Sequence, residues 1–223
     1  MQNLFTLSNR LALCAGYVRD KVKVADIGTD HAYLPVWLCL TGKAVSAVAA
    51  DINPEPLSRG AFTIEKYNAS KFVGTRLSDG LKNIKEDEAD DIIIAGMGGE
   101  LIARIIDQWP FSKNPQKRFI LQPMTKCEEL LKYLCENGFK ITAQDTCKEG
   151  KKLYTVMQVC YTGEKTVPGD DFLYLGILTP ETNENHREYA QLVLSRLEKQ
   201  RRGNKSLEAA AEIIRKRCEN HGK

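Results

Sequence analysis

The chain has 223 residues, enough for one large domain or for a domain with a small appendage. Hydrophobic residues make up 43% and charged residues 27%, so a disordered, collagen-like or disulfide-scaffold protein is excluded. The net charge is only +3, from 32 basic and 29 acidic residues. A polyanionic partner would therefore require that positive charge be gathered on one part of the surface.

The first twenty residues predict neither a signal peptide nor a membrane-spanning helix, because Ser8, Asn9 and Arg10 interrupt the apolar run. The seven cysteines form no CxxC pair, and no histidine stands at zinc-like spacing from them. We therefore expect free thiols, no metal site, no membrane association and a cytoplasmic location.

Short β-branched apolar runs alternate with helical stretches up to about residue 160, which predicts a parallel sheet covered by helices. Strands are expected at 22–27, 44–52, 75–79, 91–96 and 118–122, and helices at 32–41, 55–69, 99–108 and 125–137. Two successive strands, 139–147 and 152–161, then predict a terminal hairpin that adds an antiparallel strand to the sheet.

The last sixty residues have a different pattern. Residues 162–171 have the Gly, Pro and Asp content of a linker. Beyond Pro180, apolar residues repeat with helical spacing on both sides of Gly203 and Asn204. We expect an antiparallel, coiled-coil-like helical hairpin, and so two domains, 1–162 and 163–223.

Aspartates stand at the ends of the first three predicted strands, where ligands of open α/β sheets bind: Asp26, Asp51 and Asp79, with Asp30 in the first turn. That turn has only Gly28 of a GxGxxG motif, and a carboxylate there would repel pyrophosphate, which disfavours a nicotinamide oxidoreductase. Any single aspartate could be a helix cap. Together they suit a cationic nucleoside, and S-adenosylmethionine is that ligand.

The fourth predicted strand ends in the segment AGMGG, residues 95–99. Its glycines allow the backbone to approach a ligand, or permit tight helix packing only. Enzymes that methylate exocyclic amino groups of bases commonly have an Asn or Asp followed by two prolines at this point, and this chain does not. Its fifth predicted strand ends in Gln122, Pro123 and Met124. A ring nitrogen such as adenine N1 already has a lone pair, so its methylation needs positioning more than deprotonation.

The segments LSNRLALCAGYV, VADIGTDHAYLP, AADINP, LSDGL, AGMGGELI and ILQP, with the terminal helices, resemble the bacterial tRNA (adenine-22-N1)-methyltransferase family. The resemblance covers essentially the whole chain. It implies a class I methyltransferase fold, Rossmann-like with a mostly parallel seven-stranded sheet, and S-adenosylmethionine as methyl donor. It also implies methylation of N1 of an adenosine in the D-arm region of tRNA, with the C-terminal hairpin helping to grip the tRNA.

The resemblance places the donor among residues of four strand ends: Asp26, Gly28, Asp30, His31, Asp51, Ile52, Asp79, Gly80, Ala95, Gly96 and Met97. No general base is required, and Asp30 is a tentative candidate for stabilising the cationic product. The target base and its neighbours are expected near Arg10, His31, Tyr33, Gly98, Gly99 and Gln122. Two basic clusters are expected to contact RNA: Lys113, Lys117 and Arg118, and Arg196, Lys199, Arg201, Arg202 and Lys205.

Other interpretations stay open at this point. Tyr33 could be a helix-core aromatic, and Arg10 or the basic clusters could be ordinary solvated charges. The chain could methylate another RNA or a small molecule, or could be a non-catalytic RNA-binding module that senses the donor. We expect a monomer without an obligate protein partner.

Overall fold

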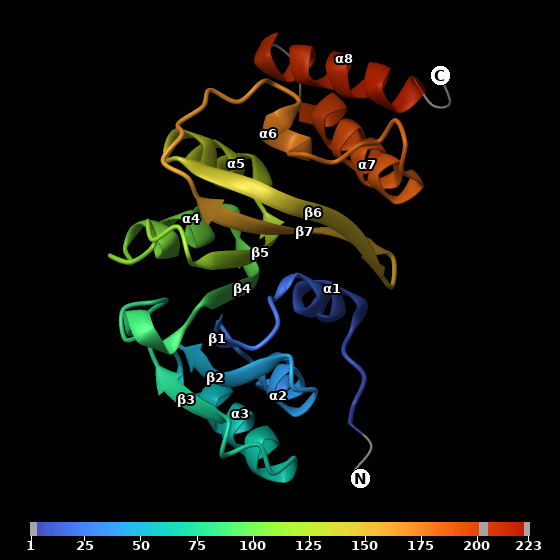
Figure 1. Ribbon diagram of the computed structural model, residues 1–223. Coiled ribbons are helices and arrows are strands. Elements are labelled where there is room, and N and C mark those ends of the chain that lie inside the picture. Colours follow the sequence, from blue (N-terminus) through green and yellow to red (C-terminus); the bar gives the residue numbers. More distant parts are fainter. Residues whose placement is uncertain (1–3, 201–204, 221–223) are drawn as a thin grey trace.

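The computed structural model describes residues 4–200 and 205–220, which form a seven-stranded sheet with helices on both faces (Figure 1). The strand order is β3-β2-β1-β4-β5-β7-β6. The strands are β1 (Val22–Ile27), β2 (Ala44–Asp51), β3 (Val73–Leu77), β4 (Asp91–Gly98), β5 (Arg118–Thr125), β6 (Phe139–Glu149) and β7 (Lys152–Tyr161). The first five strands are parallel, and β7 is antiparallel to both of its neighbours.

Two layers of helices cover the sheet, and a pair of longer helices follows them. The helices are α1 (Asn9–Tyr17), α2 (Tyr33–Leu40), α3 (Pro54–Lys66), the 3-10 turn η1 (Glu86–Glu88), α4 (Gly99–Asp107), α5 (Cys127–Glu136), α6 (Phe172–Leu175), α7 (Glu184–Gln200) and α8 (Lys205–Glu219). The predicted α/β fold, the antiparallel strand and the C-terminal hairpin are confirmed. The domain boundary at residues 162 and 163 stays a prediction.

The alternation of side chains along β4 divides the apolar core between the two faces of the sheet. Ile92 and Ile94 pack with α4 and α5, whereas Ile93 packs on the other face with α1, α2 and α3. All three isoleucines are fully buried. Because successive strand residues point to opposite faces, a continuous apolar run is what a sheet covered on both sides requires.

Among the elements that differ from the sequence-based expectation are α1 and β3. The helix α1 was not among the predicted helices. It begins after Ser8, whose hydroxyl accepts a hydrogen bond from Leu11 N, and it buries the small residues Cys14 and Ala15. The strand β3 ends at Leu77 rather than at residue 79, because its partner β2 ends at Asp51, the residue paired with Leu77.

The helices α7 and α8 pack against each other at the β6 and β7 end of the sheet, far from β3 (Figure 1). Their shared core contains Tyr189, Ala190, Val193, Leu197, Ala210, Ala211 and Ile214, and Leu153 of β7 packs against it. A polar contact joins the same parts, since His186 Nε2 lies 3.0 Å from Asp145 Oδ1. Within residues 4–200 and 205–220, no helix has the length and apolar character needed to cross a membrane.

The buried carboxylate of Asp91 depends on one arginine. Arg19 follows α1, and its backbone N and Nε each donate to this fully buried side chain at 2.8 Å. We expect Arg19→Met to lower the free energy of unfolding by about 3 kcal/mol, because an uncompensated buried charge remains. Urea unfolding checks this. Lys71→Met, on an exposed side chain, should change stability by less than about 0.5 kcal/mol, and equal effects of the two changes would contradict the prediction.

Candidate active site

The carboxylate of Asp26 lies at the end of the central strand β1 and is 7% exposed. Burial raises its pKa from 3.8 to about 6, while a hydrogen bond from Thr29 and the charge of Arg10 act in the opposite direction. The negative charge of Asp51, at the end of the adjacent strand β2, adds to the rise. Asp26 and Asp51, two of the predicted donor-binding aspartates, are therefore close enough to interact, and the carboxylate of Asp26 is shielded from solvent.

The loop after β1 is fixed by backbone hydrogen bonds to β2. The amides of Gly28 and Thr29 donate to Ala50 O at 2.8 and 3.0 Å. Gly28 has φ +79°, and a Cβ at this position would collide with Cε of Met97, which reaches over from β4. The structure thus brings together Gly28 and Met97, which were predicted to bind one ligand, and it requires glycine in the loop.

Asp30 lies at the outer side of this loop, with 66% of its side chain exposed. Its Oδ1 pairs with Arg59 Nη2 at 2.5 Å, and its Oδ2 lies 3.5 Å from His31 Nε2. Arg59 comes from α3 and was not among the predicted site residues. The positive charge of Arg59 therefore compensates the negative charge of Asp30. Asp26, in contrast, is buried.

The ends of β2 and β3 form the other part of the candidate site. Asp51 is paired with Leu77 in the sheet, and its Oδ1 accepts a hydrogen bond from Asn53 N at 2.8 Å. Ile52 and Leu77 are 59% and 54% exposed, so two large apolar side chains are accessible at these strand ends. Asp79 follows, and its hydrogen bond from Lys82 lowers the pKa of that carboxyl. Apolar and acidic groups therefore alternate along this edge.

Gln122 is fully buried. Its Oε1 accepts hydrogen bonds from Arg10 Nη1 at 2.8 Å and from Gly96 N at 3.0 Å, and its Nε2 donates to Pro123 O at 2.9 Å. The prediction that this amide binds substrate is wrong, because these bonds hold it in the interior. Its role is to join α1, β4 and β5 at Gly96, where the register of β4 shifts and φ is +82°.

Arg10 lies between the strand ends and the β6–β7 hairpin. Besides its bond to Gln122, its backbone N donates to Glu149 Oε2 at 3.1 Å, and its Cζ lies 5.9 Å from the centre of the Tyr154 ring. Neither Glu149 nor Tyr154 was predicted as a site residue, because the alternation of a strand was the only pattern there. Arg10 is thus part of the site's framework rather than an isolated surface charge.

The remaining predicted base-binding residues divide into two groups. Gly99 is buried, and a Cβ there would collide with Lys126 O, so packing accounts for this glycine. Tyr33 is 41% exposed and stacks on His31 with ring centroids 5.6 Å apart, so it is not a helix-core residue. A contact of His31, Tyr33 or Gly98 with the target base stays a prediction.

The first basic cluster does not form a phosphate-binding surface beside the candidate site. Lys117 is buried, and its Nζ donates to Glu86 O and Ala89 O at 2.6 and 2.7 Å, so its predicted contact with RNA is wrong. Arg118 bonds the carbonyls of Pro115 and Lys117. Lys113 and Lys117 precede β5, and Arg118 is its first residue. All three therefore lie at the amino end of the strand, opposite the carboxyl ends that form the candidate site.

The second basic cluster is described in part. Arg196 and Lys199 are exposed on α7, and Arg196 Nη2 lies 3.7 Å from Glu128 Oε2. Arg201 and Arg202 lie outside the described residues, and of Lys205 only the backbone at the start of α8 is described. Their predicted contact with RNA stays a prediction.

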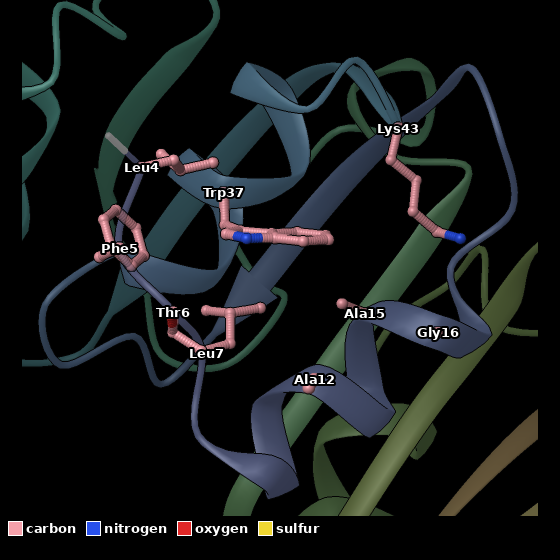
Figure 2. Close-up of a pocket in the computed structure, with 9 residues that line it drawn as sticks. All are labelled: Leu4, Phe5, Thr6, Leu7, Ala12, Ala15, Gly16, Trp37 and Lys43. Atoms are coloured by element: carbon pink, nitrogen blue, oxygen red, sulfur yellow. The ribbon is translucent and has the colours of Figure 1, made fainter. Parts of the chain in front are cut away.

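A separate cavity of about 430 Å³ lies between the N-terminal segment, α1 and α2 (Figure 2). Leu4, Phe5, Leu7 and Trp37 give it an apolar character, and Lys43 stands at its side. None of the residues predicted to bind the donor is among its described lining residues. The candidate site at the strand ends is therefore separate from this cavity.

Comparison with known proteins identifies the family. A family model described as a methyltransferase domain matches residues 7–157. The tRNA (adenine(22)-N(1))-methyltransferase of Bacillus subtilis is 35% identical over 168 residues, which are 75% of this chain and 70% of that protein. The chain belongs to the tRNA (adenine(22)-N(1))-methyltransferase family. This membership confirms the resemblance found in the sequence motifs.

Solved structures agree with this assignment. The tRNA methyltransferase TrmK of Bacillus subtilis has a TM-score of 0.79 at 28% identity, with 96% of this chain and 97% of that chain covered. A Streptococcus pneumoniae protein solved in complex with S-adenosyl-L-methionine has a TM-score of 0.86 at 29% identity, with coverage of 96% and 100%. The class I methyltransferase fold of this family member is therefore confirmed.

The burial of Asp26 predicts how stability depends on pH. Between about pH 4 and 6 the folded chain holds a proton here that the unfolded chain has lost, so stability falls as pH rises through this window. At pH 7.5 we expect Asp26→Asn to raise the free energy of unfolding, by up to about 3 kcal/mol. Urea unfolding without ligand at pH 5.0 and 7.5 measures the difference.

Asp79→Asn is the matched control, because this carboxyl is exposed and its pKa is lowered rather than raised. It should not stabilise the protein at pH 7.5. A wild type and an Asp26→Asn variant with identical pH dependence would show that Asp26 does not carry the effect.

Proposed function

We propose that this protein transfers a methyl group from S-adenosylmethionine to N1 of adenosine 22 in tRNA. The observation that carries the proposal is the buried carboxylate of Asp26 beside a tight glycine loop, at strand ends that also expose apolar residues. The name of the Bacillus subtilis relative and the donor bound by the Streptococcus pneumoniae protein support it. We also propose that the protein acts in the cytoplasm, as a monomer.

The residues present fit such a donor. Asp26 provides a desolvated negative charge for a ligand that carries an ammonium and a sulfonium, and a buried charge is most favourable when a cation approaches it. Asp51 stands where ribose hydroxyls would be bound, at the end of β2. Ile52 and Leu77 offer apolar surface for the adenine ring, with Asp79 within the same edge.

The donor, when bound, supplies a methyl group activated by positive charge on sulfur, and its transfer to N1 leaves that charge on the adenine ring. The target N1 has a free lone pair, so the protein has to position the ring and exclude water rather than remove a proton. Arg10 and Gln122 support this by fixing the backbone of β4 at Gly96, next to Met97. Asp30 is the candidate for stabilising the product cation, and it would act while paired with Arg59.

The decisive test is incubation of the full chain with an unmodified tRNA transcript and the methyl donor, followed by nucleoside mass spectrometry. We expect one 1-methyladenosine per tRNA. The matched control is the same transcript with guanosine at position 22, which should gain no methyl group. Methylation of both transcripts, or of neither, would refute the assignment to adenosine 22.

The same proposal predicts how the affinity for the donor depends on pH. Below pH 6, Asp26 takes up a proton and loses the charge that the donor requires, so affinity should fall by up to about tenfold per pH unit. Calorimetric titration at pH 7.0 and 5.0 measures the fall. Asp26→Asn should bind more weakly at pH 7.0 and lose most of the pH dependence, and a variant that binds as tightly as the wild type would contradict the role of Asp26.

A further inference from the structure

A second cleft, of about 510 Å³, lies between the end of β5, the β6–β7 turn and α7. It contains residues of all three elements: Pro123, Met124, Thr125, Cys127, Lys151, Lys152, Leu153, Tyr154, Thr155, Tyr189, Leu192, Val193 and Arg196. Apart from Arg196, none of these side chains was predicted as part of a site. The size is within the range of ligand-binding clefts.

One end of this cleft adjoins the strand-end residues of the candidate site. Pro123, which lines the cleft, is paired in the sheet with Met97 of β4. The Tyr154 ring lines the cleft and faces the guanidinium of Arg10, at 5.9 Å from Cζ. The other end lies at Arg196 of α7. The cleft therefore connects the strand ends with the C-terminal helices.

The charges in the cleft have one sign. Lys151, Lys152 and Arg196 line it, and no Asp or Glu is among its described lining residues. Within the described part of the chain, neither lysine has an acidic partner within 4.0 Å, whereas Arg196 has Glu128 at 3.7 Å. The cleft thus offers cations with two of their three charges uncompensated, as phosphates require.

The walls between these cations are aromatic and apolar. Met124 and Leu192 are 43% and 52% exposed, and Tyr154 is half-buried with its ring at the cleft surface. A single strand of nucleic acid needs this combination, because its bases stack on flat apolar side chains while its backbone follows positive charge. An acidic peptide would use the charges but would have less need of an aromatic ring.

We infer that this cleft holds the tRNA strand next to the target adenosine, with one flanking base against Tyr154 and Met124 and phosphates at Lys152 and Arg196. The inference rests on the proposed function. An adenosine turned out of its stack toward the strand ends stays joined to its neighbours, so the strand must cross the surface that adjoins them. Because Pro123 of the cleft pairs with Met97, and Tyr154 of the cleft lies against Arg10, the cleft is positioned to receive that strand.

The charges are tested with the double variant Lys152→Gln and Arg196→Gln in the full chain, with Lys71→Gln as control. Lys71 is exposed just before β3, at the opposite edge of the sheet. We expect the double variant to bind unmodified tRNA roughly tenfold more weakly, and its slope of log affinity against log salt to be shallower by roughly 0.7 per lost contact. The control should differ from the wild type by less than twofold.

The stacking platform is tested with Tyr154→Ala and Tyr154→Phe. Loss of the ring should raise the KM for tRNA roughly tenfold, whereas phenylalanine, which keeps the ring, should stay within about threefold of the wild type. Calorimetric affinity for S-adenosylmethionine and the melting temperature are measured for each variant. Unchanged donor affinity with altered tRNA binding distinguishes a contact with RNA from a disturbance of the Arg10 and Gln122 network.

The outcomes separate this inference from the proposed function. If the wild type methylates adenosine 22 while the cleft variants bind tRNA as Lys71→Gln does, the cleft has another occupant and the inference is wrong. If the wild type neither binds nor methylates tRNA, the proposed function fails and the inference with it. Weaker tRNA binding confined to the cleft variants supports both.

Discussion

The carboxylate of Asp26 is removed from water because β1 lies in the middle of the sheet. Its neighbours in the adjacent strands are Ala49 of β2 and Ile93 of β4, both fully buried and unable to solvate a charge. A charge in such a place is costly until a cation approaches it. The glycine loop and Met97 are arranged around this carboxylate, so the order of the strands determines the electrostatics of the candidate site.

The helix α1 precedes the sheet in sequence but is fixed by its last two strands. Asn9 Nδ2 donates to Lys148 O at 2.8 Å, and Gln158 Nε2 donates to Tyr17 O at 2.6 Å, so both ends of α1 are tied to the β6–β7 hairpin. Arg10 then connects this unit to Gln122. The framework around Arg10 is therefore assembled from residues more than a hundred positions apart.

The features that the sequence predicts correctly are those fixed by the position of a residue along its own strand. The aspartates at the ends of β1 and β2 were found because a parallel strand places its carboxyl end at a known edge. By the same rule Lys113, which precedes β5, lies at the opposite end of the strands. The burial of Gln122 and Lys117 could not be predicted, because it depends on carbonyl and amide partners supplied by other elements.

Tyr154 illustrates a further limit. Its position beside Arg10 exists only because β7 pairs with β5 and leaves β6 at the edge of the sheet. Hairpin spacing predicts that β6 and β7 pair with each other, but it does not say which of them joins β5. Residues on either strand could therefore not be assigned to the site from their sequence alone.

The strand order also has a consequence for synthesis on the ribosome. β7 inserts between β5 and β6, so the sheet cannot be completed before residue 161 has left the exit tunnel. The contacts of Asn9 and Arg10 with Lys148 and Glu149 must wait for the same event. The first helix to be synthesised is thus among the last to dock, and nascent chains shorter than about 160 residues have exposed apolar surface where α1 belongs.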